Sequence, residues 1–380
     1  MTEDYDLIVI DYPHLGEVAA NGLLDYFDKP QYLDQLSKLK KESVGNSHQS
    51  YFVDDHQWAL AIDAATQVSV FRKDLINFLP SSWNELVELA KNNKILWPLK
   101  PIHAISSFYS ICNNIDKPFN PDLKEFINKK TTIRTLMMMK EIVKYLPNEC
   151  LQMDSIQACE YMVENNDIFY CPYIYGFSNY SRYGFKKNVL LFSNVIDLEG
   201  NGPVGTQLGG TGIAVSKASS FKEEAFEYAL WVASSDCQKN IYYKNGGQPG
   251  NAVAWENEII NKETNNFFSS TRDTLEGAWV RPRHNGYMKF QDLGGDIIND
   301  FLKNNLNEED KQFIIKDIES DFAKGLEGIK QLPIEAKFGV FMAYRYYSQL
   351  LKKLKKTPAQ LESSYRLADF GCTSFESISE

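Results

Sequence analysis

The side chains that could support catalysis are few and scattered. Cys171 precedes Pro172 in an aromatic segment, where its thiol is a possible nucleophile, although a buried structural cysteine is the commoner case. Asp54-Asp55-His56 offers metal ligands, but acidic surface turns more often have this composition. The five histidines form neither H-E-x-x-H nor any other recognisable motif, and G-x-S-x-G is absent. The pattern favours neither a metal centre nor a catalytic triad.

The glycine-rich stretch LGGTGIAVSK (208–217) suggests phosphate chemistry at first sight. A dinucleotide fingerprint needs a third glycine where Val215 stands, and a phosphate loop needs lysine where Thr211 stands. In nucleotide sites such glycines follow a strand and open a helix, whereas Gly210 and Gly212 precede an apolar, strand-like run. We therefore interpret the stretch as a backbone crossing that leaves no room for side chains and can lend N–H groups to a ligand.

Aromatic residues recur beside turns and prolines instead of inside helical patterns. They make up 13% of the chain, and such positions at the ends of α/β elements are where ligand sites form. This recurrence favours a pocket in which rings stack on a ligand. The aromatic candidates are Trp97, Tyr173, Tyr175, Trp255 and Trp279.

The chain length and the net charge limit which classes of protein are possible. The 380 residues are enough for about two domains, and the net charge of −10 argues against nucleic-acid binding. No apolar run approaches the ~20 residues that span a bilayer, and MTEDYDLIVIDY lacks the features of a signal peptide. The six cysteines show no metal or disulfide spacing and fit a reducing compartment. From these features alone we expect a cytoplasmic protein.

The elements that must position these residues follow an α/β pattern. DLIVID (6–11) predicts a strand buried on both faces, followed by a helix. WALAIDAATQVSVFRKDL (58–75) predicts two β stretches, and SSWNELVELAKNN (81–93) predicts a helix with a capping box from Ser82 to Glu85. After the glycines, a short strand and an amphipathic helix follow.

Several of these stretches, in order, resemble the extracellular solute-binding proteins of ABC importers, of the sugar-binding type. The resemblance covers about residues 5–300 and rests on YDLIVIDYPHLGEVAANGLLDYFD, on DHQWALAIDAATQVSVFRKDLI with SSWNELVELAK, and on the stretch from LGGTGIAVSK to KNGGQP. It implies two α/β lobes joined by three crossings, which close on a ligand about a hinge. The crossings would be 62–66, 206–212 and 246–250.

The resemblance also implies a domain organisation and a site. Lobe one would be 1–63 with 208–246, lobe two 66–207 with 250–330, and 331–380 a C-terminal helical extension and tail. The protein would bind a small polar ligand, first of all a sugar, with no cofactor and no metal. Two nearby arginines would equally suit a carboxylate or phosphate. The implied ligand residues are Asp11, Tyr12, His14, Asp63, Thr66, Trp97, Tyr173, Tyr175, Gly209, Gly210, Thr211, Trp279, Arg281 and Arg283.

Two departures from the family keep a second function open. Family members carry a strand and helix, and a second strand, ahead of the point that matches the start of this chain, so we expect DLIVID to leave an exposed β edge. The family implies a periplasmic location and an ABC permease as partner, yet no signal peptide is present. An intracellular enzyme or ligand sensor on the same scaffold is the alternative, with Cys171, Asp63 or His14 as reactive groups.

Overall fold

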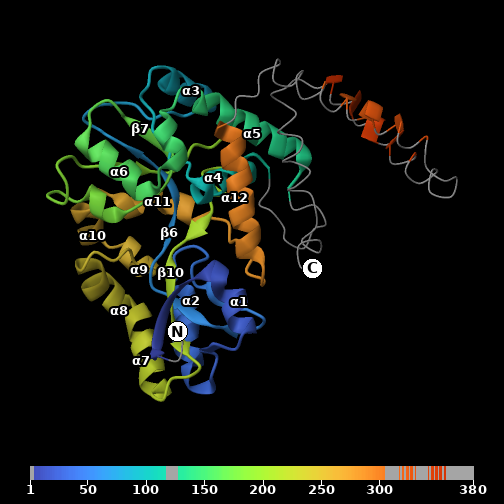
Figure 1. The fold of residues 1–380 in the computed structure, drawn as a ribbon. Helices are drawn as coiled ribbons and strands as arrows, with labels where there is room; N and C mark the ends of the chain where they lie inside the picture. The colour runs from blue at the N-terminus through green and yellow to red at the C-terminus, as the bar shows by residue number, and fades with distance from the viewer. Residues whose placement is uncertain are drawn as a thin grey trace.

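The computed structural model describes residues 4–116 and 127–303, together with scattered positions between 316 and 356. The described chain forms two lobes, one above the other in Figure 1, each built around its own antiparallel sheet. The predicted extension over 331–380 lies almost entirely outside these residues. Within the described helices, none is long and apolar enough to cross a bilayer.

Lobe one is organised around β10 (Thr211–Ser216), which begins directly after Gly210 and contains Gly212. β10 pairs along its whole length with β1 on one side and with β5 and then β2 on the other. Leu60, Ile213 and Phe226 belong to the apolar cluster between this sheet and α7. The other elements of this lobe are β1 (Leu7–Asp11), α1 (Leu15–Ala20), β2 (Leu24–Asp25), α2 (Leu33–Lys41), β3 (Phe52–Val53), β4 (His56–Gln57), β5 (Ala59–Ala61), α7 (Lys222–Ala233) and α8 (Ser235–Cys237).

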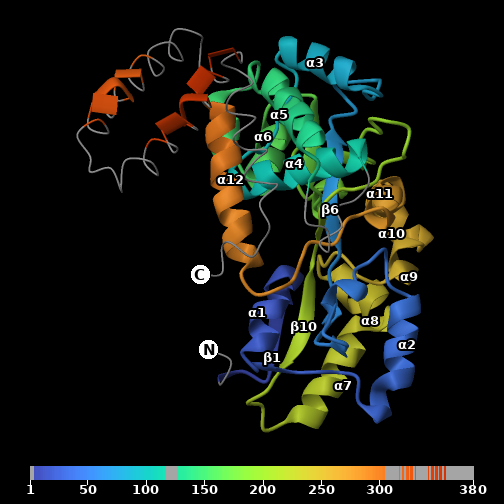
Figure 2. The same cartoon turned by 90° about the vertical axis from the view of Figure 1, so that its right-hand side faces the viewer.

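Lobe two is organised around β6 (Ala65–Phe71), the longest strand of the described chain. β7 lies on one side of β6, and β8 and β9 lie on the other. Helices α3, α4, α5 and α12 surround a core that contains Trp97, Tyr173 and Trp279 (Figure 2). The bounds are β7 (Tyr170–Tyr175), β8 (Leu191–Ser193), β9 (Leu208–Gly209), α3 (Trp83–Lys91), α4 (Pro101–Ile115), α5 (Lys129–Val143), α6 (Ser155–Glu164), α9 (Ala252–Trp255), α10 (Glu258–Glu263), α11 (Phe267–Glu276) and α12 (Tyr287–Lys303).

Three crossings join the lobes, and they are hydrogen-bonded to one another. The N–H groups of Ile62 and Asp63 donate to Thr211 O at 3.0 and 3.1 Å. Ala64 N donates to Gln248 O at 3.2 Å, and Gly250 N donates to Ile62 O at 3.3 Å. The segments 62–66, 206–212 and 246–250, which the family resemblance implies as the crossings, therefore run side by side.

Helix α3 agrees with its sequence signals in part, and strand β1 does not. Helix α3 begins after Ser82, whose side chain accepts from Glu85 N as predicted, whereas the Glu85 carboxylate bonds to Ser81 N instead of closing the box. Strand β1 was predicted to be buried on both faces, and this is wrong. β1 pairs only with β10 among the described residues, and Val9 is 59% exposed.

Candidate functional site

The segment 280–286, which leads from α11 to α12, passes between the two lobes (Figure 2). Arg281 lies at its centre and is 9% exposed. Its backbone N–H and its Nε both donate to Tyr12 Oη, at 3.3 and 3.0 Å, and its guanidinium lies over the Tyr12 ring at 4.9 Å. Tyr12 Oη in turn donates to Leu208 O at 2.8 Å. Tyr12 follows β1 of lobe one, so this set of bonds joins the lobes through a buried cation.

The lobe-two side of this cluster is polar as well. Arg281 Nη1 donates to Gln291 Oε1 at 2.9 Å from α12. Gln207 Nε2 donates to Tyr175 Oη and to Ser106 Oγ, both at 2.9 Å. Burial lowers the pKa of Arg281, but the hydroxyls of Tyr12 and Tyr175 outweigh this effect, and the net pKa is raised. The guanidinium is therefore a permanent charge in a site that also holds neutral donors and acceptors.

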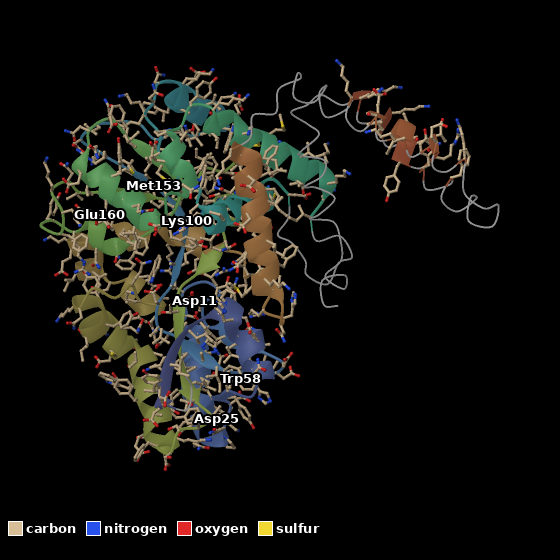
Figure 3. All side chains as sticks on the ribbon, viewed as in Figure 1. Asp11, Asp25, Trp58, Lys100, Met153 and Glu160 are labelled. Atoms are coloured by element: carbon tan, nitrogen blue, oxygen red, sulfur yellow. The ribbon has the colours of Figure 1, made fainter. Side chains whose placement is uncertain are left out.

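Two carboxylates stand on the lobe-one side. Asp11 ends β1 and is exposed, at the junction of the lobes in Figure 3. Asp63 lies in the first crossing, where burial, with a further contribution from Asp11, raises its pKa to about 7. Tyr51 Oη donates toward Ile10 O at 3.1 Å and Gly210 O at 3.3 Å, and so ties β1 to the glycine crossing beside them.

The glycine crossing has the geometry that the sequence predicted. Gly210 has φ +101°, and a Cβ atom at this position would stand 2.3 Å from Asp63 O in the neighbouring crossing. Only glycine combines that backbone conformation with so close an approach. Gly209 and Thr211 flank it and are half-buried. A role for the N–H groups of 209–211 toward a ligand stays a prediction.

Three predicted stacking residues lie in the core of lobe two instead. Trp97 is 0% and Tyr173 is 1% exposed, and their rings stack on each other with centroids 5.8 Å apart. Trp279 is 6% exposed and meets the Tyr109 ring edge-on. Their ring faces are occupied by protein, so the prediction that they stack on a ligand is wrong. The core where α3 and α4 meet the sheet needs large apolar fillers, and these aromatics supply them.

The remaining predicted residues have structural contacts. Thr66 Oγ1 lies 2.7 Å from Thr206 Oγ1 and donates to Gln207 O at 3.0 Å, within the hinge. Arg283 Nη1 donates to Gln49 O and Ser50 O, at 2.9 and 3.1 Å, and holds its segment against lobe one. His14 is half-buried immediately before α1, next to Pro13.

The catalytic role considered for Cys171 is contradicted. Its side chain is 0% exposed, and burial raises the pKa of its thiol well above the usual value. A thiol in this environment remains protonated and unreactive. Asp54 and Asp55 form the turn between β3 and β4, with φ 50° and 61°. His56 Nδ1 lies 2.6 Å from Asp28 Oδ2, so this segment is an acidic surface turn with its own partner.

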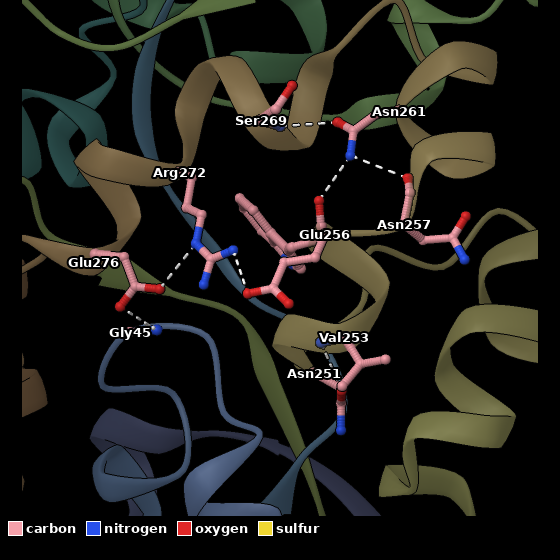
Figure 4. Close-up of polar contacts among 10 residues, drawn as sticks. Gly45, Asn251, Val253, Glu256, Asn257, Asn261, Ser269, Arg272 and Glu276 are labelled. Carbon is pink, nitrogen blue, oxygen red and sulfur yellow. Dashed lines mark hydrogen bonds and ion pairs between the residues drawn. The ribbon is translucent and has the colours of Figure 1, made fainter.

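A second set of contacts joins the lobes away from this cluster. Arg272 on α11 pairs with Glu256 at 2.7 Å and with Glu276 at 3.3 Å (Figure 4). Glu276 Oε2 accepts a hydrogen bond from Gly45 N of lobe one at 3.1 Å. These side chains are partly exposed, so the pairs contribute little energy but orient α11 against the loop around Gly45.

Several residues of the interlobe cluster carried no signal in the sequence. Tyr51, Gln207, Tyr287 and Gln291 are single polar or aromatic residues without a motif. They are identified as members of the site only in the structure, where they lie around the buried guanidinium of Arg281.

No family model matches the sequence. Among solved structures, the chain is similar to maltose-bound MalE3 of T. maritima, with 17% identity, a TM-score of 0.69, and coverage of 81% of this chain and 82% of that one. An ABC transporter solute-binding protein from Agrobacterium radiobacter K84, in complex with ribitol, gives 20% identity, a TM-score of 0.68, and coverage of 80% and 82%. A solute-binding protein from Thermotoga lettingae bound with α-D-tagatose gives 16% identity, a TM-score of 0.64, and coverage of 82% of this chain and 83% of that one.

These similarities extend over both lobes and the hinge, since each covers about four fifths of the two chains compared. At identities of 20% or less they establish the fold and leave the ligand open. This chain has the two-lobe fold of the sugar-binding solute-binding proteins of ABC transporters.

Proposed function

We propose that this protein binds a sugar or a polyol between its two lobes. The observation that carries the proposal is the polar cluster around Arg281, to which Tyr12 comes from lobe one and Tyr175, Gln207 and Gln291 come from lobe two. A ligand placed there would touch both lobes at once and would favour their closure. Maltose, ribitol and tagatose are the ligands of three proteins with this fold.

The chemistry of the cluster suits hydroxyl groups. A sugar hydroxyl both donates and accepts, so its site needs acceptors and donors side by side. Asp11, Asp63 and the unpartnered Gln207 Oε1 supply acceptors, while Arg281 and the NH2 group of Gln291 supply donors. Hydrogen bonds to charged groups contribute about 1.5–3 kcal/mol each, so a few of them are enough for micromolar binding.

The hinge supports a closing motion. The lobes are connected by three hydrogen-bonded segments, and the segment 280–286 of lobe two contacts lobe one through side chains such as Arg283. A small change of backbone dihedrals near Gly210 would rotate one lobe against the other. A ligand that binds only the closed form stabilises it by about 2.7 kcal/mol at a concentration of 100 Kd. This stabilisation makes thermal denaturation a suitable assay.

The test is a titration of the purified full-length chain with maltose, ribitol and tagatose, followed by calorimetry and by the melting temperature. We expect at least one of them to raise the melting temperature. Tyr175→Phe, which removes the hydroxyl that Gln207 donates to, should weaken binding about tenfold. Tyr145→Phe, on an exposed ring, is the matched control and should leave the affinity unchanged. The absence of binding by all three compounds would count against the proposal.

Delivery of the ligand to the permease of an ABC importer completes the proposal. It predicts that cells lacking this protein lose uptake of the bound sugar, and that the wild-type gene restores it. The Tyr175→Phe variant should restore uptake only at higher sugar concentrations. Equal uptake by cells with and without the gene would refute delivery to a permease and would leave the proposal of ligand binding standing.

A further inference from the structure

Arg281 has more donors than the protein uses. An arginine side chain carries five N–H groups. Nε donates one to Tyr12, and Nη1 donates one to Gln291. Three N–H groups, two of them on Nη2, therefore have no acceptor in the described part of the chain, although the residue is only 9% exposed.

Two further buried groups near this guanidinium lack partners. Tyr287 Oη and Gln291 Nε2 are buried and make no hydrogen bond with the residues that the structure describes. Both come from α12, one helical turn apart, and both side chains are 0% exposed. The amide oxygen of Gln291 is held by Arg281, which leaves its NH2 end as a donor. Gln207 Oε1 is the one unpartnered acceptor of the neighbourhood.

The charge of Arg281 is not neutralised by the described chain. None of the described carboxylates lies within ion-pair distance of its guanidinium, whereas buried Arg72 pairs with Asp74 at 2.7 Å. An unpaired buried charge costs several kcal/mol, and an unsatisfied buried donor costs about 1–3 kcal/mol. A group that accepts several hydrogen bonds and carries a negative charge would remove both penalties, whereas a neutral hydroxyl would remove only the second.

We propose that the ligand of this site carries an oxyanion, a carboxylate or a phosphate, which the Nη2 end of Arg281 receives together with Tyr287 Oη and Gln291 Nε2. The inference rests on the proposed function and narrows its ligand class to sugar acids or sugar phosphates. Arginine matches both groups because its planar fork donates two parallel hydrogen bonds to two oxygens. Asp11 and Asp63, on the lobe-one side, then remain for the hydroxyls.

The experiment compares matched neutral and anionic ligands on the full-length protein by calorimetry. The sets are ribitol with ribonate, and glucose with glucuronate and glucose 6-phosphate. We expect at least one anionic member to bind ten times tighter than its neutral partner, and the carboxylate and phosphate arms tell which oxyanion is preferred. Neutral members that bind as tightly or tighter would overturn this inference and leave the proposed function standing. Failure of every compound to bind would overturn both.

Inorganic anions and variants complete the test. If inorganic phosphate alone binds as tightly as the sugar phosphate, the donors hold an adventitious ion only, and the inference is wrong. Arg281→Gln should abolish the preference for the anionic member, while Arg134→Gln, which removes an exposed positive charge, should retain it. Should Arg281→Gln fail to fold, Tyr287→Phe removes a single donor and should weaken the anionic ligand several-fold while leaving the neutral one unchanged. An unchanged preference in folded Arg281→Gln or in Tyr287→Phe would contradict the assignment.

Discussion

Replacement of Gly210 by alanine tests the hinge directly. The backbone of Gly210 has φ +101°, where a side chain is strained, and a Cβ atom would stand 2.3 Å from Asp63 O and 2.9 Å from Ala64 Cα. Both neighbours are backbone atoms of the first crossing, so neither can rotate away. The crossing itself would have to move.

The expected loss follows from these two contributions. Alanine in a sparsely populated backbone region costs about 1–3 kcal/mol, and overpacking of a close contact costs about 1–3 kcal/mol more. Loss of glycine's freedom in the unfolded chain returns about 0.4–1 kcal/mol. The free energy of unfolding of Gly210→Ala should therefore fall by about 1–6 kcal/mol.

Gly184→Ala is the matched control. Its backbone has φ +81°, yet nothing lies within 4 Å of the added Cβ atom, so only the conformational strain applies. Urea unfolding followed by circular dichroism should give a loss of about 1–2 kcal/mol for this variant. If the two variants lose the same stability, to within about 0.5 kcal/mol, close contact between the crossings is not a source of hinge stability.

Two further predictions concern buried charged groups. Because the pKa of Asp63 is raised from 3.8 to about 7, the folded chain binds the proton more tightly than the unfolded chain, and this contribution to stability falls as the pH rises from about 4 to about 7. Asp63→Asn should lose less stability than wild type across that window in melts at pH 5, 6, 7 and 8, and parallel profiles would refute the assignment. Arg72 is 1% exposed and donates to the carbonyls of Met162 and Asn165. Arg72→Met should therefore lower the free energy of unfolding by about 3 kcal/mol, whereas Lys73→Met on the surface should lower it by less than about 0.5 kcal/mol. Equal urea midpoints for these two variants would contradict the role of Arg72.

The hinge could be predicted because its signal is local and ordered along the chain. Gly210 directly precedes β10 and Gly212 lies within it, where a phosphate loop would lead into a helix, and the close approach found at Gly210 is of the kind that glycine alone tolerates. The cap at Ser82 was equally local. The order of such signals along about 300 residues identified the fold.

The aromatic pocket and the first strand could not be predicted in the same way. A tryptophan beside a turn gives the same sequence pattern whether its ring faces a ligand or fills a core. Trp97 fills a core. An apolar run such as LIVID is common to a central strand and to an edge strand. Among the described residues β1 pairs only with β10, and this pairing distinguishes the two cases. Gln291 and Tyr287 are candidate site residues only because they lie beside Arg281. The helical pattern of their own segment does not show that they do.

The position of β10 at the centre of lobe one affects how the chain is made. β1, β2 and β5 all belong to the first 61 residues, yet each of them pairs with β10, which begins at Thr211. At about 5–20 residues per second, a ribosome needs roughly 8 to 30 s to synthesise the 150 residues in between. During that interval β1, β2 and β5 have left the ribosome without their partner, while the four strands of the lobe-two sheet are synthesised. The sheet of lobe two can therefore pair before the sheet of lobe one, although α12 (Tyr287–Lys303), which packs on α4, is synthesised only after both sheets.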